Sequence, residues 1–172
     1  MAGGDAQPSE TATTGARVDP RFLRVYVNDH LAVAEGISGL GRRVASAKRW
    51  RDQRADFERL ARVLEDNRRA LEEVLTSRGL KPDPLKSLLA RGGELAGRLK
   101  GNGRLVRASP LNRMVEIDGL RLGVLACMTP WETLIALGLD TARAQAALET
   151  LRREAAFVEG LREPVTRSAF AD

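Results

Sequence analysis

Proline directly follows a helix-capping residue at four places, and this pattern of helix-start signals most constrains how the chain can fold. The four pairs are Asp19-Pro20, Asp83-Pro84, Ser109-Pro110 and Thr129-Pro130. In each pair the first side chain can accept a hydrogen bond from an unpaired amide at the start of a helix. Proline suits the first helical position because an N–H there would have no partner. The sequence therefore predicts several helices, with a break or sharp kink near Thr129.

These caps predict helices over residues 20–46, 52–78, 84–100, 110–128, 130–138 and 141–161. Aromatic residues make up only 4% of the chain, so the core must consist mainly of Leu, Val and Ala, which favours helices over a sheet. We therefore predict an all-α, up-down bundle of four long helices plus a C-terminal helix. The fourth helix is apolar on nearly every side, and we expect it to be central and kinked near Thr129-Pro130.

The length of 172 residues fits one domain, which we place at residues 20–162. We expect residues 1–19 to form a disordered N-terminal segment, and they lack the pattern of a secretory signal. We expect residues 163–172 to form a loosely ordered tail. The most apolar window is interrupted by Pro130 and Glu132, so no transmembrane segment is expected. The single cysteine, Cys127, fits a reducing compartment, and we expect a cytoplasmic protein.

Helical periodicity places a few polar residues on the apolar stripes that should face the core. In the first helix His30 lies within the stripe and Asp29 at its edge, while Asn28 and Glu35 point away. Asn67 lies within the stripe of the second helix. The rest of the first stripe consists of Phe22, Leu23, Tyr26, Val33, Ile37, Leu40 and Val44.

The fourth helix offers two apolar faces. We expect the face that has Asp118 in its middle to pack against the core, and Glu116 to point away from the core. The apolar members of that face are Leu111, Val115, Leu122 and Leu125. A second stripe, expected to pack on the last helix or to make a subunit contact, consists of Leu120, Val124, Trp131 and Ile135.

Buried polar groups are costly unless they are paired. We therefore expect His30, Asn67 and Asp118, completed by Asp29, to form a buried polar cluster that fixes the packing of the helices. The alternative is a metal site, in which His30, Asp29 and Asp118 would hold iron, manganese or zinc. Ferritin-like di-metal centres use two Glu-x-x-His motifs, and this chain has none and a single histidine. The sequence thus favours the polar cluster, with no cofactor.

The residues do not form a recognisable catalytic constellation. Cys127 lies in an apolar helix without a histidine nearby in sequence, as is typical of a structural thiol. The glycine-rich stretch at 97–104 lacks the spacing of a phosphate-binding loop. We therefore lean against an enzyme.

The positive charge of the chain is local. Between Lys81 and Arg113 there are eight basic and two acidic residues, a net charge of +6, whereas the whole chain carries +5. This segment could bind an acidic protein or an anionic surface. Sequence-specific nucleic-acid binding is disfavoured, because no aromatic residue stands between Phe57 and Trp131 to stack on bases. The residues that we expect to bind an acidic partner are Arg98, Lys100, Arg104 and Arg107.

Five short motifs together resemble a family of uncharacterised bacterial helical-bundle proteins. They are Y-x-N-D-H-L-A at 26–32, E-D-x-R at 65–68, E-x-x-G-R-L-K-x-N-G-R-L at 94–105, S-P-L at 109–111 and E-[LI]-[ED] at 116–118. The resemblance spans about residues 25–135. It implies a small helical bundle, loosely similar to ferritin-like proteins, and no particular activity. Family members carry Gly-Lys before a Leu-Trp pair; this chain has Ala126-Cys127, so a role of that lysine is in doubt here.

The sequence as a whole favours a small, non-enzymatic helical bundle that acts as a binding or scaffolding protein through its basic segment at 81–113. Two alternatives stay open: a ferritin-like metal-binding protein with a site around His30, and a structural subunit of a homo-oligomer.

Overall fold

The structure is a computed structural model that describes residues 18–83 and 111–171, and those residues are mostly helical, without a strand. In chain order they form α1 (Pro20–Ser46), the short 3-10 helix η1 (Lys48–Gln53), α2 (Arg54–Thr76), α4 (Leu111–Ala136) and α5 (Thr141–Phe170). The predicted all-α class is confirmed. The helix predicted at 84–100 and the N-terminal segment at 1–17 lie outside the described residues.

The boundaries of the helices follow from local chemistry. Asp19 caps α1, since its Oδ1 accepts a hydrogen bond from the Arg21 amide at 2.8 Å and Pro20 occupies the first turn. The turns after α2 and α4 contain Gly79 and Gly138 at φ +67° and +66°, a left-handed conformation that glycine adopts without steric cost. The hydrogen bond that Asp19 accepts confirms the helix start predicted at residue 20.

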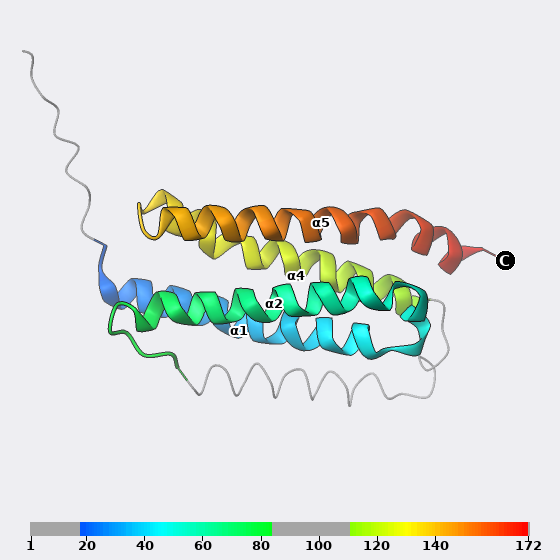
Figure 1. Cartoon of the computed structure of the whole chain (residues 1–172), viewed down its shortest axis with the longest axis horizontal. Coiled ribbons are helices and arrows are strands. Elements are labelled where there is room, and N and C mark those ends of the chain that lie inside the picture. The colour runs from blue at the N-terminus through cyan, green and yellow to red at the C-terminus, as the bar shows by residue number, and fades with distance from the viewer. Residues whose placement is uncertain (1–17, 84–110, 172) are drawn as a thin grey trace, which may run out of the picture.

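The four long helices form two antiparallel hairpins that lie side by side (Figure 1). α1 packs on α2, α4 packs on α5, and α1 also packs on α4, whereas α2 and α5 touch only sparsely. α2 ends at the opposite end of the bundle from the start of α4 (Figure 1). The core between these helices is mainly leucine and valine, joined by the fully buried Trp50, Phe57 and Trp131.

Two predicted boundaries differ from the structure. α4 continues through Pro130 to Ala136, so no separate helix starts at residue 130. Pro130 and Trp131 are buried, and this packing outweighs the local preference for a new helix start. α5 reaches Phe170 where a loosely ordered tail was expected from residue 163, and the buried Val165 ties that last part of the helix to the core. Among the described residues, no helix is both long and apolar enough to cross a membrane.

Candidate functional site

The two apolar faces of α4 are exchanged relative to the prediction. Leu120, Val124 and Trp131 are fully buried, whereas Val115 and Leu122 are 69% and 63% exposed. Because α4 is apolar nearly all round, periodicity could not rank its two faces. The structure corrects the assignment: the face expected in the core points outward.

Glu116, expected to point away from the core, is instead buried at the centre of a polar cluster. Its carboxylate accepts hydrogen bonds from the Arg49 Nε at 2.8 Å and from the Trp50 indole at 2.7 Å. The Arg49 guanidinium makes a second hydrogen bond to the other oxygen, and the Arg113 guanidinium stacks 4.3 Å from the Trp50 ring. The cluster joins η1 to the start of α4, and it compensates the burial of the carboxylate charge.

Asn67 is buried, as predicted, but its partner is a tryptophan. The Trp131 indole donates a hydrogen bond to the Asn67 Oδ1 at 2.7 Å, which connects α2 to α4. The pairing was missed because Trp131 was assigned to the other face of its helix. Tyr26 and Thr133 share a hydroxyl–hydroxyl hydrogen bond at 2.7 Å and connect α1 to α4 in a similar way.

His30 is half-buried against an aromatic ring. Its imidazole lies 4.5 Å from the Tyr26 ring, centroid to centroid, and its Nδ1 is buried without a hydrogen-bond partner in the described part of the chain. Burial lowers the pKa of His30, and the charge of the neighbouring Asp29 opposes that shift only in part. The neutral imidazole is therefore the favoured form.

The expected polar cluster is not assembled through Asp118. Its side chain is 40% exposed and pairs with the Arg162 Nε of α5 at 3.2 Å. Asp118 lies on the outward side of α4 for the reason given above. Asn67 pairs with Trp131 instead, and His30 packs against the Tyr26 ring. Within the described ranges, His, Cys, Asp and Glu side chains do not gather in a group of three that could hold a metal ion.

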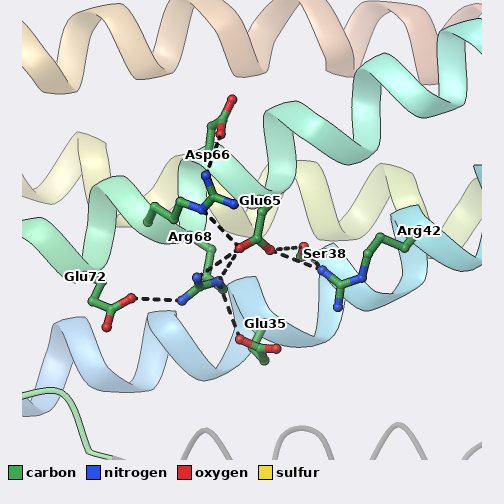
Figure 2. Close-up of polar contacts among 8 residues, drawn as sticks. Glu35, Ser38, Arg42, Glu65, Asp66, Arg68 and Glu72 are labelled. Atoms are coloured by element: carbon green, nitrogen blue, oxygen red, sulfur yellow. Dashed lines mark hydrogen bonds and ion pairs between the residues drawn. The ribbon is translucent and has the colours of Figure 1, made fainter.

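An ion-pair network lies along the seam between α1 and α2 (Figure 2). The Glu65 carboxylate accepts hydrogen bonds from Ser38 at 2.8 Å, from Arg42 at 3.1 Å and from Arg68 at 2.9 Å. Arg68 also pairs with the buried Glu35 at 3.6 Å. Burial by itself would raise the pKa of Glu65, but the hydrogen bonds from Arg68 and Ser38, with the nearby positive charges, hold it at about 2.

The orientation predicted for α1 was correct for only part of its apolar stripe. Asn28 and Glu35, expected outside, are buried, and Phe22 and Val33, expected inside, are exposed. Asn28 is satisfied on both sides of its amide, because its Nδ2 donates to the Arg24 carbonyl and its Oδ1 accepts from the Asp83 amide. Polar residues that carry their own partners can face the interior, and periodicity does not show those partners.

Cys127 is buried, and burial raises the pKa of its thiol to about 12. The thiolate is the nucleophilic form, and at neutral pH it is essentially absent here. Its environment is that of a structural core residue.

Several large apolar side chains of α1 and α4 are exposed. At the seam between these helices Gly123 of α4 lies against Ile37 of α1, so Leu122 and Val33, which neighbour these contacts along their helices, flank the seam. α1 also packs on α2, and Val27 and Leu31 are among its buried residues. We call the exposed large apolar residues of α1 and α4 the outer face: Phe22, Val25, Val33, Leu111, Val115, Leu122 and Leu125, each at least 41% exposed.

The basic residues Arg98, Lys100, Arg104 and Arg107 lie outside the described residues. Comparison of the chain with models of known protein families, with curated proteins and with solved structures gave no match.

Proposed function

We propose that the chain is a non-enzymatic helical-bundle protein that binds another protein through its outer face. The proposal takes the whole chain as an up-down bundle, with its fourth helix central and bent near Pro130. The observation that carries it is the outer face, where seven apolar side chains stay exposed although many other apolar side chains of the same helices are buried. Contiguous exposed apolar surface is typical of protein interaction sites, and the proposal takes these side chains to form such a surface.

The basic segment at 81–113 adds electrostatic selection to this surface. Its net charge of +6 favours a partner that carries acidic groups beside an apolar patch. Rim charges mainly change the rate of association and its dependence on salt, whereas buried apolar contacts hold the complex together. We therefore expect an acidic protein as the partner.

Affinity capture with matched variants tests this proposal. A protein captured by the wild-type chain should be lost with Leu122→Asp/Leu125→Asp, which places charge on the outer face. It should be retained with the control Ala142→Asp/Ala156→Asp, which changes two exposed alanines of α5. Retention of the partner by the outer-face variant would overturn the proposal.

Charge reversal tests the electrostatic part separately. Reversing Arg98, Lys100, Arg104 and Arg107 to Glu should weaken capture most strongly at low salt, because exposed charges are screened at high salt. If charge reversal leaves capture of the partner unchanged, the basic segment has no role in binding. The part of the proposal that concerns the outer face would then still stand.

Two measurements address the rival functions. Metal analysis of protein purified without a histidine tag would favour a ferritin-like function if it found stoichiometric iron, manganese or zinc that is lost on His30→Ala. Light scattering that showed a stable oligomer dissolved by Leu122→Asp would make a second copy of the chain the partner. We expect neither.

A further inference from the structure

The turn between α1 and α2, formed by η1, is basic. Four basic residues and one acidic residue stand between Lys48 and Arg54, and all five are exposed. Arg113 of α4 adds a further cation, because its guanidinium carbon lies 4.3 Å from the centre of the Trp50 ring in η1. We propose that acidic groups of the protein partner bind here, at four residues that we call the η1 patch: Lys48, Arg51, Arg54 and Arg113. This inference rests on the proposed function, since it says where that partner's charge is recognised.

Arg113 connects η1 to the basic segment at 81–113, of which it is the last residue. Trp50 is fully buried, and the stacking of Arg113 on its ring holds the guanidinium in place. η1 and the start of α4 lie at the same end of the bundle (Figure 1). Two basic stretches that are far apart in sequence therefore adjoin each other in space.

The charge of the η1 patch is largely available to a partner. Arg51 pairs with Asp52 at 3.4 Å, but the two side chains are 80% and 77% exposed, so this pair is weak. Lys48 and Arg54 make no ion pair with the other residues that the structure describes. An incoming carboxylate would therefore not have to displace a strong internal ion pair.

The chemistry of η1 favours the carboxylates of a protein. This turn already binds one carboxylate from another helix, since Glu116 of α4 accepts hydrogen bonds from Arg49 and Trp50. Nucleic acid is disfavoured because Trp50, the only aromatic residue of η1, is buried and cannot stack on bases. A membrane surface is disfavoured because η1 exposes no apolar side chain that could insert between lipids.

NMR titration of isotope-labelled, full-length protein at low salt tests the inference, with an oligoglutamate peptide as the probe. The Trp50 indole signal should shift in a saturable way, because Trp50 contacts Arg113. The Trp131 indole signal should stay in place, since Trp131 lies about 22 Å further along α4 than Glu116 at about 1.5 Å per residue.

Charge reversal in η1 should weaken binding of the peptide. Lys48→Glu/Arg54→Glu should raise its dissociation constant about tenfold, because two exposed ion pairs are lost and repulsion replaces them. The matched control Arg152→Glu/Arg153→Glu changes the net charge equally at two exposed residues of α5, and it should raise the constant by less than about threefold. Lys48→Gln/Arg54→Gln is the second variant if the first does not fold.

Three outcomes would overturn the inference. The first is a Trp50 signal that does not respond to the peptide, and the second is equal weakening by the η1 variant and its control. The third is tighter binding of phosphatidylserine vesicles, or of a single-stranded oligothymidylate of equal charge, because the ligand would then not be a protein. None of these results bears on the outer face, which is tested by capture with Leu122→Asp/Leu125→Asp, and oligoglutamate has no apolar groups for that face.

Discussion

Glu116 shows most clearly how single residues hold this structure together. The side chain of Glu116 is only 8% exposed, and that of its partner Arg49 is 42% exposed. A buried carboxylate is tolerated here because the Arg49 guanidinium and the Trp50 indole both donate to it. Removing the carboxylate leaves a buried indole N–H without an acceptor.

Glu116→Ala should therefore lower the free energy of unfolding by about 3 kcal/mol, measured by urea denaturation. The matched control is Glu163→Ala, whose side chain and that of its partner Arg167 are 73% and 79% exposed. That control should change stability by less than about 0.5 kcal/mol. Equal effects of the two substitutions would contradict the role given to Glu116.

Glu65 should make stability depend on pH. Its pKa lies at about 2 in the folded protein, against an ordinary value of 4.5. A carboxyl whose folded pKa is lowered stabilises the fold above its unfolded pKa, and this contribution is lost as pH falls from about 4.5 to about 2. Allowing for its partial exposure, the loss should be about 2 kcal/mol.

Glu65→Gln should flatten the pH dependence of unfolding within that window, because the amide does not titrate. Glu149→Gln is the control, since its pair with Arg153 is weak at 3.9 Å and both side chains are more than two-thirds exposed. A slope between pH 4.5 and 2 that is unchanged by Glu65→Gln would show that the Arg68–Ser38 network does not lower the pKa of Glu65.

At the scale of helices, the packing of α1 on α4 depends on Gly123. A Cβ built on Gly123 would lie 2.5 Å from the Ile37 Cδ1 and 2.8 Å from its Cγ1 and Cγ2, closer than real contacts allow. Gly160, in contrast, has nothing within 4 Å of such a Cβ. Alanine substitutions at these two glycines therefore distinguish the effect of packing on stability from the effect of helix propensity.

Gly123→Ala should lower the melting temperature, since overpacking costs about 1–3 kcal/mol and exceeds the gain of about 1 kcal/mol in helix propensity. Gly160→Ala should raise it, because only the propensity gain applies. Adding Ile37→Ala to Gly123→Ala should cost less than the sum of the two single changes, as neighbouring sites couple. Stabilisation by Gly123→Ala alone would contradict the close approach of the two helices.

The all-helical class and the buried side of α2 were predictable, whereas the orientation of α4 was predicted wrongly and that of α1 only in part. The Asp19-Pro20 start and the all-helical class follow from local chemistry that the sequence contains in full. The faces of α1 and α4 depend on partners that lie far away in sequence, such as Asn28 with Asp83 and Glu116 with Arg49. The buried position of Asn67 could be predicted from periodicity, but its bond to Trp131 required the correct face of α4.

The orientation of α4 can be tested directly with two leucines that differ by two positions. Leu120→Asp should unfold the protein or nearly so, because Leu120 is fully buried and the charge would have no partner. Leu122→Asp should change the free energy of unfolding by less than about 0.5 kcal/mol, because Leu122 is exposed. Circular dichroism during thermal unfolding measures both, and the reverse order would restore the orientation predicted from the sequence.

At the scale of the whole molecule, the outer face is the main departure from a closed bundle among the residues that the structure describes. The buried tryptophans, the buried Glu116 and the members of the ion-pair network in Figure 2 have polar partners. The outer face, in contrast, exposes large apolar side chains to water. In the function that we propose, the interior provides stability and the outer face provides recognition. A partner that covers this face should also raise the melting temperature by mass action.

Photo-crosslinking from position 122 tests this central claim most directly. A photoreactive phenylalanine analogue placed at Leu122 should form an adduct with a different polypeptide, and the same analogue at Ala142 of α5 should not. Mass spectrometry of the adduct identifies the partner and the contact. Crosslinks found only within the chain, for example to residues 84–110, or only to a second copy of the chain, would contradict the claim.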